Sequence, residues 1–90
     1  MVERLAGVPG GRELLEMARG RDDVFLVGGA VRDLLLGCSP RELDVVVEGD
    51  ADQAAAALAE RLPGRVTVHE RFGTASLEAG SARVDIAQAR

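Results

Sequence analysis

Residues 24–48 read VFLVGGAVRDLLLGCSPRELDVVVE, and the arrangement of the whole chain can be worked out from them. A run of β-forming residues at 24–27 ends in two glycines, which predicts a strand followed by a turn. Residues 30–36 favour a helix, and its apolar residues are Leu34, Leu35 and Leu36. Leu43–Val47 then predicts a second strand, apolar enough to lie in a sheet that is covered on both faces.

The flanking sequence predicts two more helices and three more strands. Helices are expected at 12–19 and 51–62, the second capped by Asp50. Strands are expected at 66–70, 74–78 and 82–87, with Val66 and Val68 facing inward. This order of elements predicts an α+β fold, a mixed sheet of about five strands with helices packed on it.

Composition narrows the class of protein. The chain has 90 residues, is 47% hydrophobic and carries a net charge of −4, which argues against a broad basic surface for nucleic acid. A single cysteine excludes an internal disulfide framework and fits a reducing compartment. Without a signal peptide or a long apolar span, we expect a cytoplasmic protein with no membrane contact.

Two features of the predicted strand–helix–strand segment suggest a chemical function. Gly28 and Gly29 stand where a strand gives way to a helix, and the free N–H groups of a helix start suit phosphate. Glu42 and Asp44 alternate along the second strand, so both carboxylates project from one face, about 7 Å apart. Such a pair can converge on a divalent cation. A phosphate cradle beside paired carboxylates is typical of metal-assisted phosphoryl or nucleotidyl transfer.

Each of these features also has a plain structural interpretation. A glycine pair taken alone is more often only a tight turn. Arg32 could be a solvated helix residue, and Asp33 could simply complement the helix dipole. An ion pair with an arginine such as Arg41 or Arg83 would make Asp44 a structural residue. Asp85 could likewise pair with Arg83 or with another surface arginine. The position of the two acids on the next strand after the glycine turn favours the catalytic interpretation.

Four pieces of the sequence, in the expected order, resemble the head of class II tRNA nucleotidyltransferases (CCA-adding enzymes) and bacterial poly(A) polymerases. They are GGAVRD at 28–33, RELDVVVEGD at 41–50, HERFGTA at 69–75 and RVDIAQAR at 83–90. The resemblance implies a nucleotidyltransferase fold of the DNA polymerase beta type. It also implies Mg²⁺ or Mn²⁺ as the cofactor.

The resemblance assigns roles to individual residues. The implied catalytic carboxylates are Glu42, Asp44 and Asp85, of which the first two would hold the metal. The implied nucleotide-binding residues are Gly28, Gly29, Arg32, Asp33 and Thr74. Phe72 lies in a similar segment, and we expect it in the core. The family more often has Asp at the first carboxylate, and the longer Glu42 should still reach a cation.

The implied function is transfer of a nucleotide from ATP or CTP to the 3′-hydroxyl of an RNA, with release of pyrophosphate. The RNA would be tRNA, bound through domains that are missing here. We expect residues 1–90 to form a single head domain, because the family's neck, body and tail motifs are not among them. Two alternatives stay open: a minimal nucleotidyltransferase that modifies a protein or small molecule, and a non-catalytic nucleotide-binding remnant.

Overall fold

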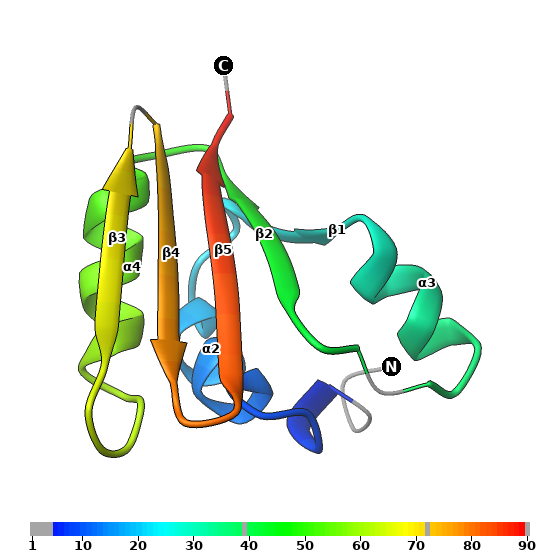
Figure 1. The fold of residues 1–90 in the computed structure, drawn as a ribbon. Helices are drawn as coiled ribbons and strands as arrows, with labels where there is room; N and C mark the ends of the chain where they lie inside the picture. Colours follow the sequence, from blue (N-terminus) through cyan, green and yellow to red (C-terminus); the bar gives the residue numbers. More distant parts are fainter. Residues whose placement is uncertain (1–4, 39, 72, 90) are drawn as a thin grey trace.

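The computed structural model describes residues 5–38, 40–71 and 73–89, and the structural statements below concern these residues. Three helices and five strands follow one another along the chain (Figure 1). In order they are α2 (Gly11–Ala18), β1 (Val24–Val27), α3 (Gly29–Leu35), β2 (Leu43–Val47), α4 (Ala51–Ala59), β3 (Thr67–Arg71), β4 (Thr74–Ala79) and β5 (Ala82–Gln88). None of these helices has the length and apolar character needed to cross a bilayer.

The expected α+β fold is confirmed, and seven of the eight elements begin and end within one residue of the predicted positions. The exception is α4, which ends at Ala59 rather than at residue 62. After Ala59, the Arg61 amide donates to the Leu58 carbonyl at 2.9 Å. This hydrogen bond spans three residues, as in a 3₁₀ turn, and marks the end of the α-helix. The expectation for Phe72 falls outside the described residues.

The five strands form one mixed sheet in the order β1-β2-β5-β4-β3. Neighbouring strands are antiparallel except β2 and β5, which pair in parallel at the centre (Figure 1). In this register Leu43 lies opposite Val84, and Asp44 lies opposite Asp85. Residues far apart in the sequence therefore become direct neighbours in the middle of the sheet.

One face of the sheet carries the hydrophobic core. Alternate residues of β2, β4 and β5 point into it, and α2 and α4 lie behind the sheet in Figure 1. The largest fully buried side chains are Leu34, Leu43, Val45, Val47, Leu58, Leu77, Val84 and Ile86. Short aliphatic side chains fill this core, as expected from a chain with only two aromatic residues.

The expectation that both faces of β2 are covered is wrong. Leu43, Val45 and Val47 are buried, whereas Asp44 and Val46 are only half-buried. The neighbouring Phe25 of β1, paired with Val46, is 46% exposed. Among the described residues, β2 is thus covered on one face, and its apolar run reflects a central position rather than two covering layers. The second face, called the open face below, remains accessible.

The apolar residues of α3 differ in burial, and one expectation about β3 is wrong. In α3 only Ala30 and Leu34, four residues apart, face the core, while Leu35 and Leu36 are 65% and 72% exposed. A helix of this length presents one narrow stripe to the sheet, so neighbouring leucines point away. Val68 is 38% exposed instead of inward, because β3 is an edge strand. Val66, just before β3, does pack against the core.

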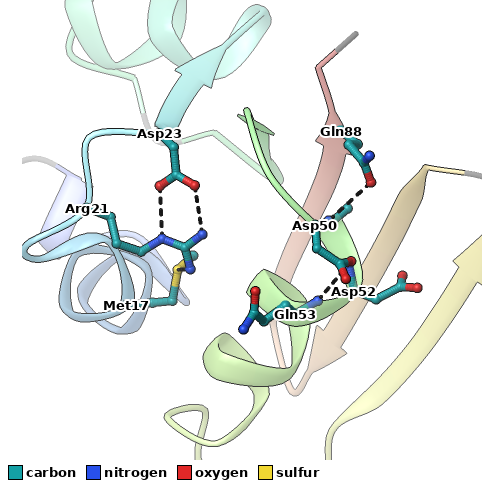
Figure 2. Close-up of polar contacts among 8 residues, drawn as sticks. Met17, Arg21, Asp23, Asp50, Asp52, Gln53 and Gln88 are labelled. Carbon is teal, nitrogen blue, oxygen red and sulfur yellow. Dashed lines mark hydrogen bonds and ion pairs between the residues drawn. The ribbon is translucent and has the colours of Figure 1, made fainter.

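The N-terminus of α4 is capped as predicted. Asp50 has extended backbone, and its Oδ1 accepts from the amides of Asp52 at 2.9 Å and Gln53 at 3.3 Å (Figure 2). Gln88 Oε1 accepts from the next amide, that of Ala51, at 3.5 Å. Both contacts satisfy free helix N–H groups, so they fix where α4 starts behind the sheet.

A bidentate ion pair fixes the connection from α2 to β1. Arg21 donates from Nε to Asp23 Oδ1 at 3.0 Å and from Nη2 to Oδ2 at 2.9 Å (Figure 2). The Asp23 carbonyl in turn accepts from the Glu48 amide at 2.9 Å, just beyond β2. The hydrogen bonds from Arg21 hold the pKa of the Asp23 carboxyl below its ordinary value. Folding therefore favours the ionised carboxylate.

We expect Asp23→Asn to lower the thermal midpoint near neutral pH. A carboxyl with a lowered pKa stabilises the fold above its unfolded-state pKa of about 4, and this contribution is lost as the pH falls through the folded-state value. The gap between wild type and Asp23→Asn should therefore close in acid. Thermal melts from about pH 7 to about pH 2 measure this, with the exposed Asp22→Asn as control. A gap that stayed constant with pH would contradict the ion pair.

Candidate active site

Three carboxylates converge on the open face of the sheet. Glu42 lies just before β2, Asp44 on β2 and Asp85 on β5. Each offers an oxygen within 4.8 Å of the others. The parallel pairing of β2 with β5 causes this, because it sets Asp44 directly opposite Asp85. The three residues predicted as catalytic acids thus lie together, and the cluster is able to hold a metal ion.

Ser76 of β4 orients the third carboxylate. Its Oγ donates to Asp85 Oδ1 at 2.5 Å, a short, charge-assisted hydrogen bond. Asp44, Asp85 and Ser76 occupy paired positions on three neighbouring strands. Ser76 was not among the residues predicted from the sequence. The available signal was its alternation with Thr74, which puts both residues on the same face of β4.

The glycine turn lies against the second carboxylate. Gly28 has φ 73° and ψ −150°, a conformation that favours glycine. A Cβ at this position would lie 3.4 Å from Asp44 Oδ2. Gly29 follows as the first residue of α3. The turn between β1 and α3 therefore needs glycine both for its backbone and for its close approach to Asp44.

Two hollows meet at the carboxylates. The larger, of about 620 Å³, lies between α3 and the start of β2 and is lined by Gly29, Ala30, Asp33, Pro40, Arg41, Glu42, Asp44 and Arg83. The smaller, of about 310 Å³, runs along the open face and includes Thr74, Ser76 and Val27 in its lining. Asp44 and Arg83 belong to both. A ligand spanning the two hollows would pass over the acidic cluster.

The predicted nucleotide-binding residues are divided between these hollows. Gly29 and Asp33 line the larger and Thr74 the smaller, so the structure brings all three to the site. Arg32 is outside both linings: its side chain is 73% exposed and pairs with Asp33 at 3.5 Å. Arg32 stands at the rim, next to Gly29, rather than inside the pocket.

Arg83 brings a positive charge to the cluster. Its Nε lies 3.2 Å from Glu42 Oε2 and 3.9 Å from Asp85 Oδ2. Within the described residues no ion pair joins Asp44 to Arg83 or to Arg41. The structural interpretation of Asp44 as one half of an ion pair therefore finds no support.

Comparison with known proteins agrees with this geometry. The family model described as the poly(A) polymerase head domain matches residues 24–90. That range includes the glycine turn, the three carboxylates and all five strands.

Three similar proteins illustrate the match. The chain is 44% identical over 81 residues to an A-adding tRNA nucleotidyltransferase of Halalkalibacterium halodurans, covering 88% of this chain and 19% of the relative. It is 45% identical over 71 residues to a CC-adding tRNA nucleotidyltransferase of Deinococcus radiodurans, covering 76% and 18%. A solved tRNA nucleotidyltransferase, complexed with a primer tRNA and an incoming ATP analog, superposes with a TM-score of 0.70 at 40% identity, covering 86% and 23%. The chain spans about a fifth of the length of these proteins.

We expect Gly28→Ala to impair divalent cation binding more than its effect on stability explains. The backbone strain costs about 1–3 kcal/mol, and the added methyl group meets Asp44 Oδ2. Gly64→Ala is the matched control, since Gly64 has φ 76° with nothing within 4 Å of its Cβ position. Both variants should melt earlier, but only Gly28→Ala should weaken Mn²⁺ binding in a calorimetric titration. Equal binding by both would mean that the turn does not position Asp44.

Proposed function

Since the chain belongs to the family of poly(A) polymerase head domains, we propose that it is the catalytic head of a tRNA nucleotidyltransferase. It would transfer a nucleotide from ATP or CTP to the 3′-hydroxyl of tRNA and release pyrophosphate. The observation that carries this proposal is the convergence of Glu42, Asp44 and Asp85 within 4.8 Å beside the glycine turn. Residues 1–90 would act as one domain of a larger assembly.

The donor set of the cluster fits Mg²⁺ or Mn²⁺. All three groups are carboxylates, the hard oxygen ligands that these cations prefer, and each is partly open to solvent. Glu42 and Asp44 are the proposed ligands, with Asp85 as a third. A bound divalent cation would supply Lewis-acid stabilisation of charge on the reacting phosphate and the attacking oxygen.

The chain's own residues would bind and orient the reactants. The nucleotide would lie over Asp44, with its phosphates in the larger hollow near Gly28, Gly29 and Asp33. Thr74, at the start of β4, would contact it from the smaller hollow. Arg32 would reach the triphosphate from the rim, which requires its exposed side chain to leave Asp33.

The reaction breaks a phosphoanhydride bond of the nucleoside triphosphate and forms a phosphodiester bond to the RNA. The 3′-oxygen of the RNA forms a bond to the α-phosphorus, the bond from that phosphorus to the β-phosphate oxygen breaks, and the hydroxyl proton is released. Asp85, held by Ser76, and Asp44, held opposite it by the β2–β5 register, would keep the reacting groups in line. Positioning is thus the main contribution of this small, rigid sheet.

Asp44→Asn tests this proposal against a structural role for Asp44. Like charges on one sheet face destabilise by several tenths of a kcal/mol to about 1 kcal/mol, so the variant should melt at the wild-type temperature or slightly above it. Binding of ATP with Mg²⁺, measured by calorimetry, should be weak in wild type and lost in Asp44→Asn. EDTA should abolish it, and the exposed Asp52→Asn on α4, behind the sheet, should bind normally. A destabilised Asp44→Asn that still bound nucleotide would refute the metal site.

We also expect the 90-residue chain by itself not to add CCA to tRNA. It carries a net charge of −4 and spans about a fifth of its relatives' length, so most of the tRNA-binding surface would come from other segments. Incubation with tRNA lacking its 3′ end and labelled CTP or ATP, followed by gel analysis, measures this. Ordered addition of C, C and A by this chain would contradict the proposal that other segments bind the tRNA.

A further inference from the structure

Arg83 lies among acidic side chains of three strands. Its Nε is 3.2 Å from Glu42 Oε2, at the start of β2, and 3.9 Å from Asp85 Oδ2, two residues along on β5. On the other side, its Nη1 is 3.8 Å from Glu78 Oε1 of β4. Glu78 pairs directly with Arg83 in the β4–β5 ladder. One guanidinium therefore joins two members of the carboxylate cluster to an acid outside it.

Arg83 contacts carboxylates that would also hold a cation. Two of the three cluster residues, Glu42 and Asp85, pair with Arg83, whereas the third, Asp44, has no such pair within the described residues. Asp85 keeps a second contact through its Oδ1, which Ser76 holds. A divalent cation and the guanidinium would thus compete for the same carboxylates.

We propose that Arg83 is a built-in counter-ion of the carboxylate cluster, which competes with the divalent cation and is retained by Glu78 when the cation binds. This inference rests on the proposed metal site. Arg83 neutralises the repulsion among the three acids in the absence of a cation. Because Glu78 is already in contact, the guanidinium can give up Glu42 and Asp85 without leaving the sheet.

The exposure of these side chains keeps the competition reversible. Arg83 and Glu78 are each 50% exposed and Glu42 47%, so each pair contributes little to stability and exchanges readily. Two unit charges about 4 Å apart interact by about 1 kcal/mol in water, which corresponds to about a fivefold change in an equilibrium constant. Removing Arg83 should therefore change cation affinity by about three- to tenfold.

The test is a calorimetric titration of the whole chain with Mn²⁺ alone, at low ionic strength. Asp44→Asn first identifies the site, since Mn²⁺ binding there should disappear. Arg83→Gln should bind Mn²⁺ about three- to tenfold more tightly than wild type. Arg12→Gln removes the same charge from α2, behind the sheet, and should stay within about twofold of wild type. Thermal melts in EDTA should show a lower midpoint for Arg83→Gln, with a larger gain on adding Mn²⁺.

Glu78→Gln provides the opposite change. Without Glu78 the guanidinium turns fully to the cluster, so Mn²⁺ should bind about two- to threefold more weakly than in wild type. In the Arg83→Gln background, Glu78→Gln should change Mn²⁺ affinity less than it does in wild type. A smaller change would show that Glu78 acts through Arg83, and not only through the loss of its own negative charge. If Arg83→Gln melts too early to be titrated, Glu78→Gln still tests the proposal. Arg83→Lys, which keeps the charge, should then bind Mn²⁺ about as wild type does, and Glu78→Gln should bind it more weakly.

The outcomes separate this proposal from the proposed function. Asp44-dependent Mn²⁺ binding that Arg83→Gln leaves unchanged would overturn the counter-ion role and leave the metal site intact. Weaker binding by Arg83→Gln would also overturn it, since Arg83 would then assist the cation. An absence of Mn²⁺ binding by the wild-type chain would overturn both the counter-ion role and the metal site.

Discussion

The parallel pairing of β2 with β5 is the constraint on which the site depends. It is the one parallel contact in a sheet otherwise built from antiparallel neighbours, and it sets Asp44 opposite Asp85. A shift by one residue would turn one carboxylate into the core and present an aliphatic side chain in its place. The register is secured because Leu43, Val45 and Val47 meet Val84 and Ile86 on the buried face. Packing on one face thus determines the chemistry of the other.

One face of the sheet carries the hydrophobic core, and the other carries the candidate site. Aliphatic side chains and two covering helices account for the core, which contains no buried charged group among the described residues. The acids, Ser76 and Arg83 all project from the open face, where solvent keeps their mutual interactions weak. Charge repulsion within the site is therefore tolerated, since the core that opposes it lies on the far side of the same strands.

Local sequence patterns predicted most of the fold, and the family resemblance predicted the three acids that the structure brings together. Alternation and turn residues placed β1 and β2 correctly, and Asp44 was identifiable because it follows a glycine turn on a strand. Alternation along β4 placed Ser76 on the same face as Thr74, but its contact with Asp85 depends on the pairing of β4 with β5, which local patterns do not give. Arg83 was recognisable as an ion-pair partner, whereas its contact with Glu42 depends on β5 lying beside β2. The prediction that Val68 faces inward was wrong for a related reason: hydrophobicity alone does not tell whether a strand is central or at an edge.

The strand order of the sheet also bears on the order in which its strand pairs form during folding. β3, β4 and β5 follow one another in the sequence with only two residues between neighbouring strands, so their pairing closes only short loops. Asp44 and Asp85, in contrast, are separated by about 40 residues, and bringing β2 beside β5 closes a much longer loop. We therefore expect the hairpins to form early and the carboxylate cluster to form later, because it depends on the most non-local pairing in the sheet. A partly folded chain that held its antiparallel strand pairs would still lack the carboxylate cluster, so the cluster reports on the completion of the sheet.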